Sequence, residues 1–124
     1  MQDFLLVSFG AVLGANIRFI IYKRFEQINL SSSSSILIIN TLASFFLGLF
    51  FSLLPNISDY KFSYQLVLFV SIGFLGSLST LSSFIYDLFD LFSQYKFFRA
   101  LKLLVLSLSL GLIALAFGTF IGNQ

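Results

Sequence analysis

The sequence contains neither cysteine nor histidine, and only 10% of its 124 residues are charged. The absence of these two residue types excludes disulfide frameworks, zinc sites, thiol nucleophiles and imidazole general bases. The acidic residues are too few and too scattered to form a convincing carboxylate pair: Asp3, Glu26, Asp59, Asp87 and Asp90. From this inventory we do not expect an enzyme.

Hydrophobic residues make up 58% of the chain and fall in blocks along it. The blocks are near or above the length of about 20 residues that an α-helix needs to cross a bilayer. A chain with less than half the charge of an ordinary soluble domain has too little polar surface to cover a soluble globule. The sequence therefore predicts an all-α integral membrane protein whose surrounding solvent is lipid.

We expect a single domain, 1–124, with four transmembrane helices at about 4–22, 36–54, 62–92 and 103–121. The serine-rich stretch 25–35 predicts a loop, with Ser35 as the cap of the second helix. Pro55 is expected to end that helix, because proline cannot easily continue the helical hydrogen bonds. A basic connector is expected at 95–102. Four crossings place both termini on the same side of the membrane.

The basic residues gather at the ends of the hydrophobic blocks: Arg18, Lys23, Arg24, Lys61, Lys96, Arg99 and Lys102. Long cationic side chains at such positions reach the lipid headgroups and report the topology of a membrane protein. They form no stripe that follows a nucleic-acid backbone, so we expect no nucleic-acid partner. Arg18 is more readily explained as such an anchor than as a functional residue.

The third hydrophobic block is too long for one straight helix. As a helix its 31 residues would span about 46 Å, against a hydrocarbon core of about 30 Å. Two glycines and five hydroxyl residues between Gly73 and Phe84 predict a break near 73–80. Gly76 tolerates backbone conformations that other residues cannot adopt, and a broken helix exposes carbonyl groups that can bind a cation. A simple kink without an ion is the alternative.

Small residues four apart predict close helix contacts, at Gly10 and Gly14, at Ser44 and Gly48, and at Gly118 and Gly122. We assign these positions to packing. Asn40 lies within the second helix, where an amide must meet protein partners or water. Four thin helices have little interior for such polar groups, so oligomerisation is expected.

Three runs of residues together resemble the Fluc (CrcB) family of fluoride channels. Gly73 to Phe84 is similar to the family signature Gly-Phe-Cys-Gly-Gly-x-Thr-Thr-Phe-Ser-Thr-Phe. Gly10 to Arg18 is similar to its first-helix motif, Gly-Gly-x-x-Gly-Ala-x-x-Arg, and Ile39 to Phe45 to its Asn-x-x-Gly-Ser-Phe. Each motif is weak alone, but their order, the chain length and the four helices make the combination specific.

The resemblance implies an antiparallel dimer with two narrow fluoride pathways and a central structural sodium ion, Na+. The sodium ligands carried over to this chain are the backbone oxygens of Gly76 and Ser79. The implied pore-lining groups are the amide of Asn40, the ring of Phe84 and the hydroxyls of Thr80, Ser83 and Ser107. The implied function is passive, fluoride-selective export from the cytoplasm, which lowers fluoride toxicity, across the plasma (inner) membrane of a prokaryote.

Two positions depart from the family in ways that change their chemistry. Leu81 stands where the family has its first pore phenylalanine, so it lines the pore without an aromatic edge, and Leu103 stands where the family has a tyrosine. One alternative is therefore that this chain is a non-conducting partner in a heterodimeric channel. The second subunit of the dimer is accordingly expected to be either identical or related. A small multidrug exporter is a weaker alternative, because it needs a carboxylate in the first helix and 4–22 contains none.

Overall fold

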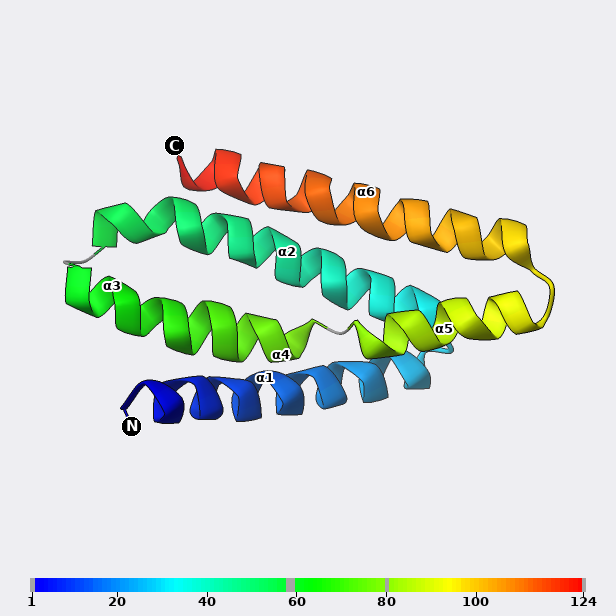
Figure 1. The fold of residues 1–124 in the computed structure, drawn as a ribbon, viewed down its shortest axis with the longest axis horizontal. Helices are drawn as coiled ribbons and strands as arrows, with labels where there is room; N and C mark the ends of the chain where they lie inside the picture. Colours follow the sequence, from blue (N-terminus) through cyan, green and yellow to red (C-terminus); the bar gives the residue numbers. More distant parts are fainter. Residues whose placement is uncertain (1, 58–59, 80, 124) are drawn as a thin grey trace.

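The computed structural model describes residues 2–57, 60–79 and 81–123. Figure 1 shows an elongated bundle of long helices, with the N-terminus and the C-terminus at the same end. Within the described residues, four helical stretches are long and apolar enough to span a membrane: Gln2–Gln27, Ser33–Pro55, Lys61–Ser93 and Phe97–Gly122. The prediction of an all-helical, multi-pass membrane protein is confirmed.

The first two helices leave a much shorter connection than the sequence predicted. Helix α1 runs over Gln2–Gln27 and α2 over Ser32–Ile57, so the expectation of a loop over 25–35 is wrong for most of that stretch. Ser35 bonds back to the start of this helix, since its Oγ donates to the Ser31 carbonyl oxygen at 3.1 Å. The Ser34 backbone N–H donates to Ser31 Oγ at 3.2 Å, which makes Ser31, and not Ser35, the cap of α2.

Two other predicted helix ends are also wrong. Helix α2 continues through Pro55 to Ile57, because the missing proline N–H removes only one bond in a helix that is about to end. Helix α6, Phe97–Gly122, takes up most of the predicted basic connector. Arg99 and Lys102 fit on a helix there, since their stems lie along apolar surface while their charged ends reach water.

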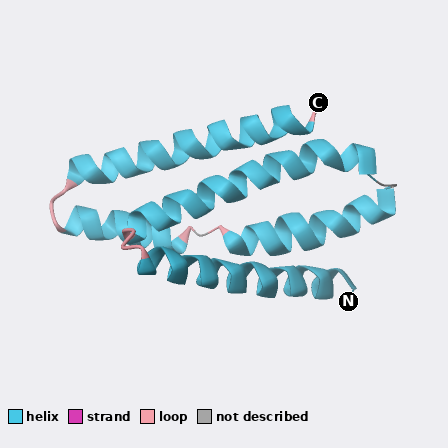
Figure 2. Cartoon of the chain, turned by 180° about the vertical axis from the view of Figure 1, so that it is seen from behind, coloured by secondary structure: helices cyan, strands magenta, loops and turns pink. Residues whose placement is uncertain are grey.

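The third span is interrupted at Ser79, within the predicted range 73–80 and after its two glycines. It consists of α3 (Tyr60–Leu66), a π-helical segment η1 (Val67–Leu75), α4 (Gly76–Leu78) and α5 (Ser82–Ser93). Ser79 leaves the helix with φ −74° and ψ 156°, whereas Gly76 has ordinary helical angles of −63° and −37°. The expectation that Gly76 provides an unusual backbone conformation is therefore wrong. Figure 2 shows the interruption from behind.

Small residues bring α1 directly against the third span, its main partner. A Cβ atom added to Gly10 would collide with the Phe69 carbonyl oxygen and would lie 3.0 Å from the Phe74 backbone nitrogen. One added to Gly14 would collide with the Phe74 carbonyl oxygen. No side chain fits between these two backbones, so the packing role predicted for Gly10 and Gly14 is confirmed.

The second close pair is α2 with α6, which lie side by side along their length. A Cβ atom at Gly48 would collide with the Leu115 carbonyl oxygen, and one at Gly118 with the Phe45 carbonyl oxygen. One at Gly122 would collide with a serine hydroxyl of α2. The small-residue spacings predicted for this pair are confirmed as packing contacts.

The interior between the two helix pairs is small. Its buried members are Ile39, Ala43, Leu75 and Leu78. The chain exposes 8384 Å² of surface, whereas a compact soluble protein of 13.9 kDa exposes about 6,700 Å². Most of the apolar surface is thus left for lipid or for another protein chain.

Candidate functional site at the helix break

The break in the third span is held to α1 by an arginine. Arg18 is half-buried, and its Nη1 donates a hydrogen bond of 3.4 Å to the Ser79 carbonyl oxygen, 61 residues later in the chain. Ser79 is where the backbone turns extended, so its carbonyl has left the regular helical pattern. Arg18 therefore reaches into the protein and is more than an anchor to the headgroups.

A pocket of about 280 Å³ lies beside this break, between α2 and the third span. Its lining consists of three serines, one glycine and four apolar residues: Ser44, Ser71, Ser79, Gly76, Ala43, Leu47, Ile72 and Leu75. Gly76 is exposed and Ser79 half-buried. The two residues predicted to bind sodium thus lie in one pocket, which α2 also lines.

The oxygens of this pocket suit a hard cation, because Na+ binds to unwound backbone carbonyls and hydroxyls in membrane proteins. The contact with Arg18 uses one of the two lone pairs of the Ser79 oxygen and leaves the other. Ser79 Oγ donates to the Gly76 oxygen over a long 3.5 Å, which leaves that oxygen accessible as well. One chain offers these two carbonyl oxygens, so a complete coordination shell around Na+ needs further ligands.

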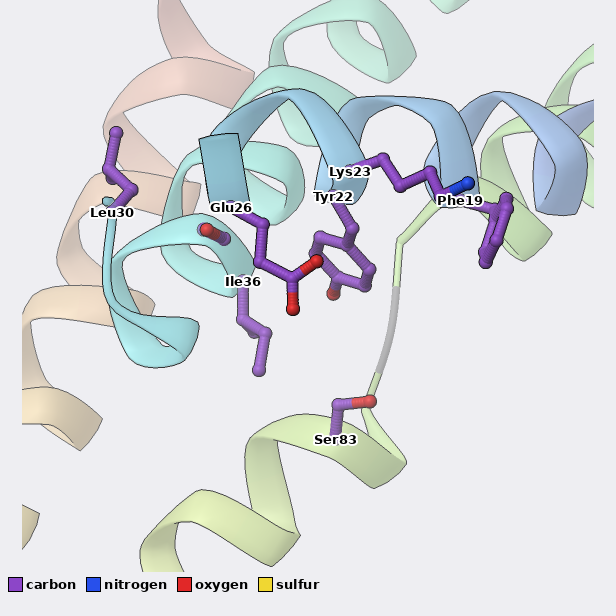
Figure 3. A pocket seen from close by; sticks show the side chains of 8 residues that line it. Phe19, Tyr22, Lys23, Glu26, Leu30, Ile36 and Ser83 are labelled. Atoms are coloured by element: carbon purple, nitrogen blue, oxygen red, sulfur yellow. The ribbon is translucent and has the colours of Figure 1, made fainter. Parts of the chain in front are cut away.

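A larger pocket, of about 490 Å³, opens between the end of α1, the start of α2 and the start of α5 (Figure 3). Its lining is Phe19, Tyr22, Lys23, Glu26, Leu30, Ser35, Ile36 and Ser83. Lys23 Nζ lies 5.4 Å from the centre of the Phe19 ring, which places a cation at one side of the pocket. Ser83, a predicted pore residue, approaches the pocket from α5.

Tyr22 is not among the site residues predicted from the sequence. Its hydroxyl oxygen is buried and has no hydrogen-bond partner within the described part of the chain. Tyr22 lies four residues after Arg18, so the two occupy one face of α1. That spacing is the signal by which the residue could have been found. A second missed residue is Asp87, whose carboxylate accepts a 3.1 Å hydrogen bond from Ser33 Oγ and joins α5 to α2.

The other predicted pore residues lie on three different helices. Asn40 is half-buried on α2, and Ser107 is half-buried on α6. On α5, Phe84 is buried with 8% of its surface exposed, whereas Leu81 at the break is 71% exposed. Thr80 lies outside the described residues. Within the described part of the chain, Asn40, Phe84 and Ser107 line neither of the two pockets above.

Four apolar spans define a small multi-pass membrane protein, and the third span is interrupted by a break beside a pocket that serine residues line. Residues 5–119 match the family described as CrcB-like protein, Camphor Resistance (CrcB). A protein of Prochlorococcus marinus (strain NATL2A), described as Fluoride-specific ion channel FluC 2, is 60% identical over 124 residues, which is 100% of both chains. The chain belongs to the CrcB family, as its three motifs predicted.

Proposed function

We propose that this chain forms a fluoride-selective passive ion channel, and is not an enzyme. The observation that carries the proposal is the 60% identity over full length to a protein described as a fluoride-specific ion channel. The channel lets fluoride leave the cytoplasm down its gradient and so lowers fluoride toxicity. We place the channel in the plasma (inner) membrane of a prokaryote, because its four apolar helices are long enough to cross a bilayer.

We propose further that the channel is an antiparallel dimer. Gly76 supports this, because a Cβ atom there would meet only the Ser71 carbonyl oxygen at an ordinary 3.6 Å. The residue is also exposed and has helical angles, so no contact with another described residue explains a glycine at this position. Close approach of a second chain would explain it. A partner at Gly76 would also supply the oxygens that one chain lacks around Na+.

In this proposal, each pore residue attracts fluoride weakly, and the ion passes from one residue to the next. The amide of Asn40, the hydroxyls of Ser83, Thr80 and Ser107, and the ring edge of Phe84 each carry partial positive charge. Conduction needs sites that an ion can leave, and partial charges satisfy this better than a bare cation would. Arg18, the full positive charge nearest the break, already donates to the Ser79 oxygen.

The direct test is ion release from liposomes that contain this chain alone. We expect the fluoride gradient to collapse and the chloride gradient to persist, with a rate ratio of at least about a hundredfold, or about 2.7 kcal/mol in barrier height. Liposomes without protein are the control for leak. Equal release of the two ions contradicts the proposal. Fluoride release that requires a proton gradient would favour a coupled exporter instead.

The proposed Na+ is structural, with the backbone oxygens of Gly76 and Ser79 from two chains as its ligands. Replacing Na+ by N-methyl-D-glucamine at constant ionic strength should weaken the dimer and lower fluoride flux. Loss of an ion present at about 100 times its Kd costs about 2.7 kcal/mol of stability. Exchange of the accompanying anion at constant Na+ is the matched control. Unchanged dimer stability and unchanged flux after cation exchange would remove Na+ from this site.

A second candidate function rests on Leu81. Its side chain is 71% exposed at the break, and it supplies no aromatic edge where a pore phenylalanine is expected. The chain would then be a non-conducting subunit that packs against a related, conducting partner. This candidate differs in one measurable way: the chain alone releases no fluoride, and release appears when the related partner is added.

A further inference from the structure

A third pocket, separate from the helix break, lies at the end of the bundle opposite the chain termini. It has a volume of about 430 Å³ and is bounded by the start of α2, the end of α5 and the first turns of α6. Its polar lining is Ser31, Ser33, Ser34, Arg99 and Lys102, and its apolar lining is Leu37, Leu91, Leu103 and Leu106. None of the functions above uses this pocket.

Its two cations are available to a ligand. Arg99 and Lys102 are exposed, and neither forms an ion pair or a hydrogen bond with another described residue. One anionic group lies near, since Asp87 accepts the hydroxyl of Ser33. That hydrogen bond satisfies part of the carboxylate, and the lining itself carries two positive charges and no negative one.

Along α6, the two cations of the pocket come before its two leucines, Leu103 and Leu106. Arg99 and Lys102 stand in the first two turns of α6, and Leu106 lies about 10 Å beyond Arg99 along the helix axis. A phospholipid has the same order, with a charged phosphate first and hydrocarbon below it. A free inorganic anion would gain nothing from four leucines, because its hydration would be lost against them.

We propose that this pocket binds the headgroup and upper acyl chain of an anionic phospholipid. Arg99 binds the phosphate through its planar fork of donors, Lys102 adds a second charge, and the leucines contact the acyl chain. Lys23, Arg24 and Lys96 lie at the same end of the bundle, so this end faces the cytoplasm by the positive-inside rule. The cytoplasmic leaflet carries the anionic lipids that basic pockets between helices bind.

The test is lipid binding to the purified full-length protein in detergent, read by native mass spectrometry. Phosphatidylglycerol and phosphatidylcholine with identical acyl chains are the two probes. We expect phosphatidylglycerol to remain bound at a concentration at least about tenfold lower. The double variant Arg99→Gln/Lys102→Gln should lose about thirtyfold in affinity for phosphatidylglycerol, as expected for the loss of two cations near an anionic headgroup.

The matched control is Arg24→Gln/Lys96→Gln, which also removes one arginine and one lysine from this end but no residue of the pocket lining. It should change the affinity by less than about threefold. Equal losses in both double variants would show a general surface attraction and overturn the proposal. No preference for phosphatidylglycerol would also overturn it, as would failure of the native dimer to retain any lipid.

Two soluble competitors separate a lipid site from a phosphate site. Inorganic phosphate and glycerophosphoglycerol carry the same anionic chemistry without acyl chains. Neither should displace phosphatidylglycerol, because the four leucines contribute only to lipid binding. Displacement by either would show that the pocket takes a free phosphate, against the proposal. All these readouts are independent of fluoride flux, so the lipid site and the channel can fail separately.

Discussion

Replacement of Asn40 by aspartate is expected to abolish fluoride flux. The side chain is half-buried on α2, where an amide can donate two N–H groups to an anion and a carboxylate can donate none. A carboxylate also repels fluoride, by about 4 kcal/mol for charges about 4 Å apart at an effective dielectric constant of about 20. A barrier raised by that amount slows passage about a thousandfold.

The measurement is fluoride efflux from liposomes with equal amounts of each variant. Thr41→Asp is a matched control: it places the same charge one residue further along α2, on a face turned by about 100°. The Thr41 hydroxyl donates to the Leu37 carbonyl oxygen at 2.7 Å, so its donor is used within the helix. Undiminished flux in well-folded Asn40→Asp protein would remove Asn40 from the pathway. Equal loss in both variants would show only the cost of a charge in the membrane.

The chain is also expected to insert into the membrane in one orientation. With the termini outside, the inner side of the membrane meets the end of α1, the connection after α5 and the start of α6. These segments carry Lys23, Arg24, Lys96, Arg99 and Lys102, against Lys61 on the outer side. Figure 1 shows that α1 and α5 both end in the half of the bundle away from the termini. Such a bias in short loops sets the orientation of a membrane protein. We therefore propose a related second subunit of opposite bias as the natural partner in an antiparallel dimer.

Single cysteines at Ser58 and Gln94 test this, because the chain has no cysteine of its own. Position 94 should label only from the cytoplasmic side and position 58 only from the outer side. The control is a variant with Lys96, Arg99 and Lys102 all changed to glutamine. It keeps two basic residues on the inner side against one on the outer side, so it should give mixed labelling. Labelling of both positions from both sides, in a chain that keeps all its basic residues, would show dual insertion and favour a homodimer.

Much of the fold could be predicted because lipid imposes strong rules. The number of spans follows from apolar block length, and the helix contacts follow from glycine spacing. Helix ends were less predictable. The serines after Ser31 suggested a loop by composition, yet α2 begins at Ser32 and the Ser35 hydroxyl bonds back to the Ser31 carbonyl oxygen. The break lies within the predicted range 73–80 but not at Gly73, which serves to admit α1: the Val7 oxygen would lie 2.7 Å from a Cβ atom there.

The candidate site was less predictable than the fold. The three motifs showed the family, but among the described residues Asn40, Phe84 and Ser107, which they suggest for the pore, line neither pocket at the helix break or beside α1. The contact between Arg18 and Ser79 joins positions 61 residues apart, and no local pattern encodes it. The buried hydroxyl of Tyr22 depends in the same way on how α1, α2 and α5 meet. Such features arise from tertiary packing, which sequence periodicity does not record.

The π-helical segment η1 makes chain length part of the site. Its hydrogen bonds include one from the Gly76 N–H to the Ser71 oxygen, five residues back, so the segment holds more residues per turn than an α-helix does. Were the segment to relax to α-helical winding without losing its extra residue, everything after it would rotate by about 100°. Ser79 would then turn away from Arg18. A comparison of residue types alone cannot detect this requirement, since it depends on how many residues precede the break.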